Sequence, residues 1–314
     1  MCYNFGMKVT IAVCTWNWAE SLRNTLNSFL ALKIPDGVEV EMIVVDNNST
    51  DKTSEVIDSF LDRLPLKKLF ESKQGLSHAR NCAIDAAQGE LILFTDHDAV
   101  VAPDWLEAYY SASQRWPEAS YFGGRITPMY EADPPVWVVS HLNLLEGAIL
   151  IRNLGTEERK LLPNEQVFGA NLIFRREVFD HWRFDAKFGP AGTELILGDE
   201  TMFLENLKNH GKYGVWVPAA KVKHFVPRKR VSTEFVKRYF VGLGRTNIRV
   251  SGPPGGKKLF GAPRALFRQW GVATVKAHLL KWTGMGDWFP HFLYASEVRG
   301  MIIESQKQFQ QTGK

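Results

Sequence analysis

Residues 90–106 read ELILFTDHDAVVAPDWL, and this stretch gives the first indication of the fold. An apolar run from Leu91 to Phe94 ends in two aspartates that flank a histidine. A short apolar run bounded by polar residues predicts a buried strand. Because residues i and i+2 of an extended chain point to one side, Asp96 and Asp98 should converge while His97 turns away.

Strands and helices are predicted to alternate around this stretch. Further strands are expected at 9–14, 40–45 and 213–217, and helices at 20–32, 76–87 and from Pro103 onward. Ser49 or Thr50 is expected to cap a helix that runs through residues 56–61. Strands that alternate with helices and are apolar on both faces predict an α/β fold with a mostly parallel central sheet flanked by helices.

The carboxyl-terminal part differs in composition. The GPPGGKK segment at 252–258 is a linker candidate, so we predict a domain at 1–250 and a basic, aromatic-rich helical extension at 251–314. Residues 1–220 carry 20 Lys+Arg and 30 Asp+Glu, whereas residues 221–314 carry 18 and 4. The two parts should therefore meet different partners.

The basic extension permits two interpretations. It suits peripheral contact with an anionic membrane surface, or a helical appendage that packs on the α/β domain or on a second subunit of a homo-oligomer. Its interleaved aromatic residues also permit nucleic-acid binding, but no recognised module is present, so we predict no nucleic-acid partner.

Composition also indicates the compartment. The chain has 314 residues, enough for one large domain or two modest ones. Its amino terminus gives no sign of a secretory signal, and no window reaches the roughly 18 apolar residues of a membrane span. Its three cysteines lack metal-site spacing. We therefore expect a reduced, cytoplasmic protein.

Polar clusters follow three of the predicted strands: TWNW at 15–18, DNNSTD at 46–51 and TDHD at 95–98. Ligands of parallel sheets bind beyond the carboxyl ends of the strands. Two carboxylates as close as Asp96 and Asp98 repel each other unless a cation or a proton lies between them. A divalent ion completed by substrate phosphates is one solution. The alternative is an Asx turn with a helix cap, which explains only one aspartate.

The same edge of the sheet suits a nucleotide. Thr15, Asn17 and Glu20 offer groups for a base or ribose, and Asp46 can accept a hydrogen bond from an imide N–H such as that of uracil. Gly75 permits close backbone approach. Arg80 can reach phosphate or ribose, or it forms an ordinary surface ion pair. Neither the GxGxxG nor the GxxxxGK[ST] fingerprint is present.

Four motifs in register resemble glycosyltransferase family 2 of GT-A fold: residues 15–17 (TWN), 46–51 (DNNSTD), 75–81 (GLSHARN) and 94–106 (FTDHD with PDWL). The resemblance implies a nucleotide-diphosphate sugar donor, usually a UDP-sugar, inversion at the anomeric carbon, and Mn²⁺ or Mg²⁺ held by Asp96 and Asp98. The implied nucleotide contacts are Thr15, Asn17, Glu20, Asp46, Asn48, Gly75, Arg80 and Asp96.

The resemblance continues more weakly to about residue 244. Residues 167–179 (VFGANLIFRREVF) are similar to a segment near the donor sugar and acceptor, which implies contacts by Gly169, Ala170 and Asn171. His224, before a basic run, is implied as a third metal ligand, which suits imidazole's affinity for transition metals. The alternative is an ordinary core or surface histidine.

Residues 197–211 (LGDETMFLENLKNHG) are similar to the family segment that carries the catalytic base. The family commonly has Gly-Glu-Asp where this chain has Gly198-Asp199-Glu200. Alignment by position assigns the base to Glu200 and alignment by residue type to Asp199. We favour Glu200, with Asp199 as its partner. The alternative is that both acids merely complement a helix amino terminus.

The predicted function is metal-assisted single displacement onto a hydroxyl of a glycan or lipid-linked acceptor, as in polysaccharide biosynthesis. A base removes the proton of the hydroxyl, and the metal stabilises the leaving diphosphate. One alternative is a nucleotidyltransferase on a related α/β fold, which should have a glycine-rich loop where TWNW stands. Another is a non-catalytic carbohydrate-binding homologue, which should have lost an aspartate or the base.

Overall fold

The structure is a computed structural model that describes residues 6–190 and 195–312. The chain divides into two compact units. The first comprises Met1–Asp133, Ile149–Lys187 and Asp199–Val226, and the second comprises Pro134–Ala148, Phe188–Gly198 and Pro227–Lys314. None of the boundaries between these units falls at residue 250, because one helix, α8 (Thr233–Ser251), runs across that position. The predicted division into a domain at 1–250 and an extension at 251–314 stays a prediction.

Nine strands of the described residues form one mixed sheet in the first unit. Its order is β3-β2-β1-β4-β8-β6-β9-β5, and β7 pairs with β9. The strands are β1 (Lys8–Thr15), β2 (Glu39–Asp46), β3 (Leu66–Phe70), β4 (Leu91–Asp96), β5 (Ala99–Val101), β6 (Tyr121–Tyr130), β7 (Arg159–Lys160), β8 (Leu172–Arg175) and β9 (Gly214–Val226). The first four of the order are parallel neighbours, β8 lies antiparallel between β4 and β6, and β9 is parallel to β6. The predicted α/β class with a mostly parallel sheet is confirmed.

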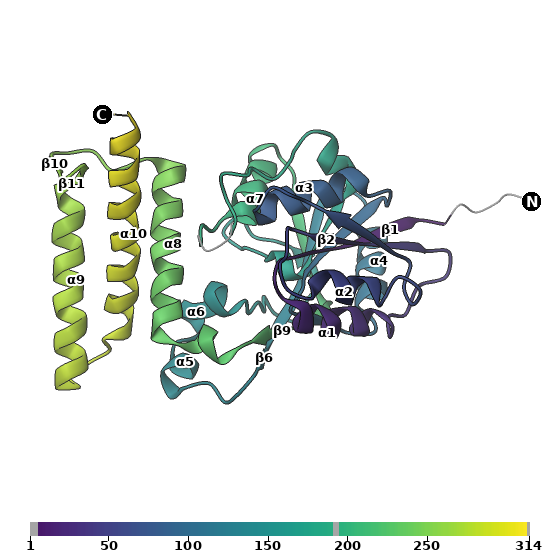
Figure 1. Cartoon of the computed structure of the whole chain (residues 1–314), viewed down its shortest axis with the longest axis horizontal. Coiled ribbons are helices and arrows are strands. Elements are labelled where there is room, and N and C mark those ends of the chain that lie inside the picture. Colours follow the sequence, from purple (N-terminus) through teal and green to yellow (C-terminus); the bar gives the residue numbers. More distant parts are fainter. Residues whose placement is uncertain (1–5, 191–194, 313–314) are drawn as a thin grey trace, which may run out of the picture. The chain divides into compact units, whose positions relative to one another are not determined.

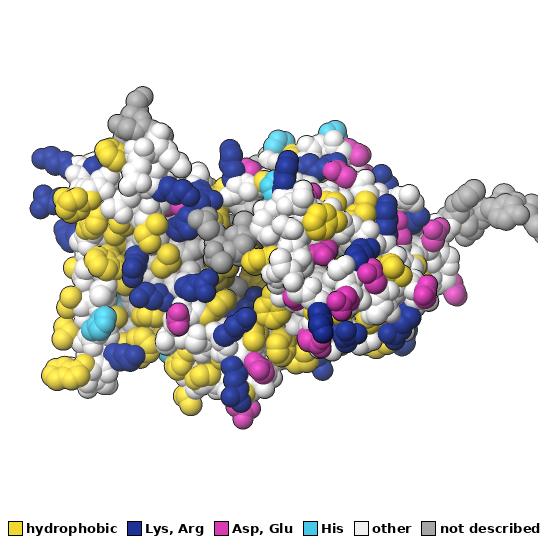
Figure 2. Space-filling view, viewed as in Figure 1, with side chains coloured by type: hydrophobic (Ala, Val, Ile, Leu, Met, Phe, Trp, Pro, Cys, Tyr) yellow, Lys and Arg dark blue, Asp and Glu magenta, His cyan; other side chains and the backbone are white. Residues whose placement is uncertain are grey.

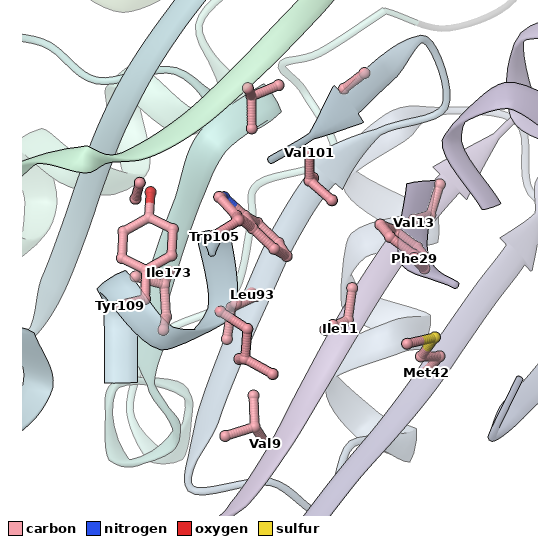
Figure 3. Packing of buried hydrophobic residues seen from close by; sticks show 14 of the residues in the cluster. Val9, Ile11, Val13, Phe29, Met42, Leu93, Val101, Trp105, Tyr109 and Ile173 are labelled. Carbon is pink, nitrogen blue, oxygen red and sulfur yellow. The ribbon is translucent and has the colours of Figure 1, made fainter. Parts of the chain in front are cut away.

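Helices cover both faces of the sheet (Figure 1). They are α1 (Ala19–Phe29), α2 (Thr53–Asp58), α3 (Leu76–Ala86), α4 (Trp105–Arg115) and α7 (Asp199–Asn209), with short 3₁₀ turns η1 (Gly169–Asn171) and η2 (Arg176–Asp180). The side chains of β1 alternate between two cores. Val9, Ile11 and Val13 pack with α1, α2 and α4 (Figure 3), and Ala12 and Cys14 pack with α3 and α7. Apolar residues at every strand position therefore fill both faces.

The predicted cap of α2 is wrong. The helix begins at Thr53, and its N-cap residue Lys52 makes no side-chain cap bond. Asp51 instead accepts from the backbone N–H of Thr53, at 2.9 Å. Ser49 and Thr50 bond to Asn17 instead. The Ser49 hydroxyl accepts from the Asn17 N–H, and the Asn17 side-chain oxygen accepts from the Thr50 N–H.

The second unit is mainly helical, and the predicted carboxyl-terminal helices are confirmed. It contains α5 (Val136–Ser140), most of α6 (Leu142–Ile149), η3 (Arg228–Val231), α8, a small hairpin of β10 (Lys258–Leu259) and β11 (Ala262–Pro263), α9 (Arg264–Thr283) and α10 (Phe289–Thr312). Helix α10 lies between α8 and α9 (Figure 1). Among the described residues, no helix combines the length and the apolar character needed to cross a membrane.

Two glycines let α8 and α10 approach closely. A Cβ on Gly244 would lie 1.9 Å from the carbonyl oxygen of Glu297, and one on Gly300 would lie 2.0 Å from that of Val241. Both neighbours are backbone atoms of helices, so they cannot move independently. We expect Gly244→Ala to lower the free energy of unfolding by about 1–3 kcal/mol, measured by thermal unfolding of the helical signal.

The matched control is Gly271→Ala in α9, where an added Cβ meets nothing within 4 Å. Alanine is favoured over glycine in a helix by up to about 1 kcal/mol, so this variant should melt at or above the native temperature. If the Gly244→Ala variant had the same melting temperature as the control, the close approach of the two helices would be contradicted.

Candidate active site

Three metal-binding side chains meet beyond the end of β4. Ligand atoms of Asp96, Asp98 and His224 all lie within 4.8 Å of one another. His224 belongs to β9, which runs on to Val226, and it pairs with Ala99 of β5 directly after the aspartates. The His224 Nε2 lies 3.1 Å from Asp98 Oδ1. Two carboxylates and an imidazole are a donor set that fits Mn²⁺. The carboxylates also fit Mg²⁺, which prefers oxygen ligands over nitrogen.

The two aspartates converge as predicted, because the residue between them is held on the other side. His97 Nδ1 lies 3.2 Å from the carbonyl oxygen of Cys14, and its ring stacks on Trp18 with centroids 5.4 Å apart. Its own carbonyl accepts from the hydroxyl of Thr25 in α1, at 2.9 Å. These contacts fix the turn from β4 to β5 and leave Asp96 and Asp98 on one side.

The electrostatics of this cluster favour a cation. Asp98 and His224 are buried and Asp96 is half-buried. Burial, and then the charge of Asp98, raise the pKa of Asp96, although Arg80 and His224 act in the opposite direction. A positive ion between the carboxylates would relieve both their burial and their repulsion.

A second charged cluster, made of other residues, lies in the same unit. The Arg80 guanidinium, from α3, forms an ion pair with Asp199 at the start of α7 and lies 3.3 Å from Glu200 Oε2. It also lies over the ring of Phe184, 5.2 Å from the centroid. Arg80 is therefore a buried ion-pair partner of the two acids, not the surface residue that a lone helical arginine suggests.

One arginine faces two buried acids, so their pKa values separate. Burial, and then the charge of Glu200, raise the pKa of Asp199 well above its usual range. Burial also acts to raise the pKa of Glu200, but Arg80 and a hydrogen bond from Asp199 outweigh it and hold that pKa low. Glu200 is the acid that stays ionised, and it is the more exposed of the two, at 17% against 3% of the side chain.

Most predicted nucleotide contacts surround the ends of β1 and β2. Thr15 and Asp46 are register partners at these ends, and the buried Thr15 hydroxyl has no hydrogen-bond partner among the described residues. Asp46 Oδ1 accepts from the Ser49 N–H, at 2.9 Å. Glu20 and Asn48 are exposed, and Asn48 adopts a positive φ of 65°. The side-chain oxygen of Asn17 is already engaged by the 50–51 backbone.

One residue that sequence reasoning missed organises this region. Asn47 donates to the carbonyls of Glu71 and Lys73 and accepts from the N–H of Gly75, at 2.8 Å. It thereby holds Gly75 at a φ of 141°, which only glycine adopts readily. The DNNSTD cluster contains Asn47, but its partners lie on a later loop that the sequence does not place.

The glycine–alanine–asparagine segment packs beneath the second charged cluster. A Cβ on Gly169 would lie 2.1 Å from Arg80 Nη2, so the absence of a side chain there makes room for the guanidinium. The carbonyl of Ala170 accepts from the Thr95 hydroxyl, at 2.8 Å. Contacts of these residues with a sugar stay predictions.

The Asn171 side chain is fully buried and has four partners within the protein. Its oxygen accepts from Trp105 Nε1 and the Tyr109 hydroxyl, both at 2.7 Å, and its nitrogen donates to the carbonyls of Arg125 and Ala220. These bonds exhaust the capacity of the amide, so a contact with a ligand would have to displace one of them.

We therefore expect Asn171→Ala to destabilise the protein by roughly 3 kcal/mol or more, because it removes four hydrogen bonds from a buried site. Urea-induced unfolding measures the loss. Asn24→Ala, the same change at an exposed position of α1, is the control and should alter stability by less than about 0.5 kcal/mol. Equal stability of the two variants would show that Asn171 is not a packing residue.

The chain is similar in sequence to known proteins. Residues 10–183 match the family model of glycosyl transferase family 2. The chain is 25% identical over 279 residues to the succinoglycan biosynthesis protein ExoM of Rhizobium meliloti, covering 87% of this chain and 82% of that protein. It is also 25% identical over 224 residues to a glucosyl-dolichyl phosphate glucuronosyltransferase of Haloferax volcanii, covering 69% of each.

Solved structures show the same fold. The mannosyltransferase PcManGT from Pyrobaculum calidifontis, in complex with GDP-Man and Mn²⁺, has a TM-score of 0.61 at 18% identity, covering 99% of this chain and 88% of that one. S. aureus TarS 1-349 in complex with UDP-GlcNAc has a TM-score of 0.56 at 15% identity, covering 97% and 92%.

Proposed function

The chain belongs to glycosyl transferase family 2, and we propose that it transfers a sugar, with inversion, from a nucleotide-diphosphate sugar to a hydroxyl of a glycan or lipid-linked acceptor. UDP is the proposed nucleotide, because Asp46 at the end of β2 can accept from the imide N–H of uracil. The observation that carries the proposal is the presence of two acidic clusters that share no residue, one suited to a cation and one suited to a base.

Asp96, Asp98 and His224 would hold Mn²⁺ or Mg²⁺. When bound, the ion supplies positive charge to the leaving diphosphate. Thr15 and Asp46 support nucleotide binding, because the Thr15 hydroxyl has no protein partner in the described chain and lies beside Asp46. Gly75 and the 46–51 loop would shape the walls around the base and ribose.

Glu200 is the proposed general base. Its pKa is held low by Arg80, so it is ionised and can accept the proton of the acceptor hydroxyl. Asp199 is the proposed positioning partner: its raised pKa lets it keep a proton and donate a hydrogen bond to Glu200. Arg80 contacts both acids and keeps them in place.

Several wider assignments complete the proposal. The chain would act in polysaccharide biosynthesis at a cytoplasmic location, with peripheral membrane contact through its carboxyl-terminal helices. The proposed separation of roles also argues against a non-catalytic carbohydrate-binding homologue, because both the cation cluster and a base candidate are complete.

The test is a panel of UDP-, GDP- and dTDP-sugars, each with and without Mn²⁺. We expect a UDP-sugar to raise the melting temperature only when the metal is present, and to be slowly hydrolysed. Stabilisation by a GDP-sugar instead would correct the nucleotide. If no nucleotide-sugar changes the melting temperature under either condition, the proposed activity is wrong.

A further inference from the structure

A cavity of about 260 Å³ lies within the second unit, between α8, α9 and α10. Its lining combines cationic side chains with aromatic rings: Lys237, Lys281, Arg299, Trp270, Trp288 and Phe292. None of the lining residues is acidic. The site identified above uses no residue of this unit, so the cavity is a separate feature.

The chemistry of the cavity suits an anion attached to an apolar group. Lysine and arginine bind phosphate oxygens, and the rings offer apolar contact beside them. The Lys281 ammonium lies 4.5 Å from the centroid of the Trp288 ring, so it is held at the wall of the cavity. The lining also includes Thr274, whose buried hydroxyl has no hydrogen-bond partner among the described residues.

Helix α9 presents an apolar stripe to solvent. Val272, Val275, Leu279 and Trp282 are exposed by 63%, 58%, 53% and 85%. Their spacing of three and four residues places them on one side of the helix, away from the side that buries Ala273 and Ala277. Figure 2 shows hydrophobic side chains exposed over this part of the second unit.

The charge of α9 identifies what would cover the stripe. The helix carries four basic residues and no acidic one. An exposed apolar side together with lysine and arginine is typical of a helix that lies in the interface of an anionic membrane. A second copy of the chain would bring the same positive charge against it, which disfavours self-association through this helix.

The stripe and the cavity are continuous on the helix surface. His278 lines the cavity. It lies three residues after Val275 and four before Trp282, and residues at these separations are neighbours on a helix. A molecule whose charged end occupies the cavity could therefore extend its apolar part along the stripe.

We propose that the second unit binds an anionic phospholipid at a membrane surface. The cavity receives the phosphate of the head group, and the stripe of α9 lies at the level of the acyl chains. This inference deepens the membrane contact proposed above and rests on it, and it is independent of the transfer reaction.

Co-sedimentation of the full chain with vesicles tests the proposal. We expect binding to phosphatidylcholine vesicles that contain one third phosphatidylglycerol, and little binding to phosphatidylcholine alone. Lys237→Ala with Lys281→Ala should weaken binding about 30-fold, since each lysine near the surface contributes about 1 kcal/mol. Leu279→Asp with Trp282→Asp should abolish binding.

The matched control is Lys257→Ala with Lys307→Ala, which removes the same charge at exposed positions outside the cavity. It should weaken binding by less than about threefold, because these residues do not line the site. Equal losses in the two lysine pairs would show a diffuse charge effect and overturn the assigned site. Absence of binding to the anionic vesicles would overturn the proposal as a whole.

The source of the phosphate is tested by competition. Soluble dihexanoyl phosphatidylglycerol should displace the chain from vesicles, whereas inorganic phosphate at equal ionic strength should not. If inorganic phosphate competes equally well, the cavity is a simple anion site and the lipid assignment is wrong. A dimer in solution that the Leu279→Asp with Trp282→Asp variant dissociates would assign the stripe to a second copy instead.

Donor hydrolysis without vesicles separates this proposal from the proposed function. The Lys237→Ala with Lys281→Ala variant should retain full hydrolysis, because neither lysine belongs to the candidate active site. Loss of vesicle binding with hydrolysis intact would leave the function standing, and vesicle binding without hydrolysis would leave the lipid site standing.

Discussion

Replacement of Asp98 by alanine should remove metal-dependent donor binding and lower transfer about 10³-fold. Asp98 is 6% exposed, and its carboxylate lies 3.1 Å from His224 Nε2 in the cluster that would hold the ion. Loss of the ion's charge on the leaving diphosphate costs several kcal/mol, and each 1.4 kcal/mol is about tenfold in rate. Titration of Mn²⁺ into the protein with a UDP-sugar, followed by thermal shift, measures the effect.

The control for this variant is Asp104→Ala. Asp104 follows β5, the strand directly after Asp98, but it is exposed and makes no side-chain cap bond at the start of α4. It should bind metal and donor as the native chain does. Retention of metal-dependent donor binding in Asp98→Ala would show that the cation is held elsewhere.

Glu200→Gln should leave donor binding intact and lower turnover by about 10²–10⁴-fold, the usual contribution of a positioned base. The glutamine has nearly the same shape, and Arg80 keeps its contact with Asp199, so the fold should survive. Because Arg80 and the hydrogen bond from Asp199 lower the pKa of Glu200, native turnover should fall only at pH values below the usual range of a glutamate. The pH–rate profile checks this direction.

Two further variants test the assignment of the base. Glu205→Gln on the same helix is a control, because its carboxylate contacts Lys208 near the surface, and it should be fully active. Asp199→Asn separates the two acids: full turnover in Glu200→Gln together with its loss in Asp199→Asn would move the base to Asp199.

Much of the first unit could be predicted from sequence, because its signals are local. The runs at 9–14, 40–45 and 91–94 are continuous apolar strands, and they become β1, β2 and β4 within two residues at each end. Burial on both faces follows from the alternation of Val9, Ile11 and Val13 with Ala12 and Cys14. The helix predicted at 76–87 is α3, since Gly75 and Gly89 bound it.

Other parts could not be predicted, because their partners lie far along the chain. The antiparallel insertion of β8 between β4 and β6 depends on pairing across long loops. The cap of α2 was missed because Asn17, from another loop, binds the residues expected to form it. The role of Asn47 was missed for the same reason: its amide bonds reach the 71–75 loop.

Local patterns were enough to predict that Asp96 and Asp98 share a side, because side chains of a strand repeat every two residues. The alternation of apolar strands with helices was enough to predict the sheet that presents them. The family resemblance implied His224, Arg80, Asp199 and Glu200 as site residues, but the folded chain shows how they meet. His224 joins the aspartates through the pairing of β9 with β5, and Arg80 meets Asp199 and Glu200 through the packing of α3 near the start of α7. Contacts of this kind depend on strand register and core packing, which no local pattern encodes.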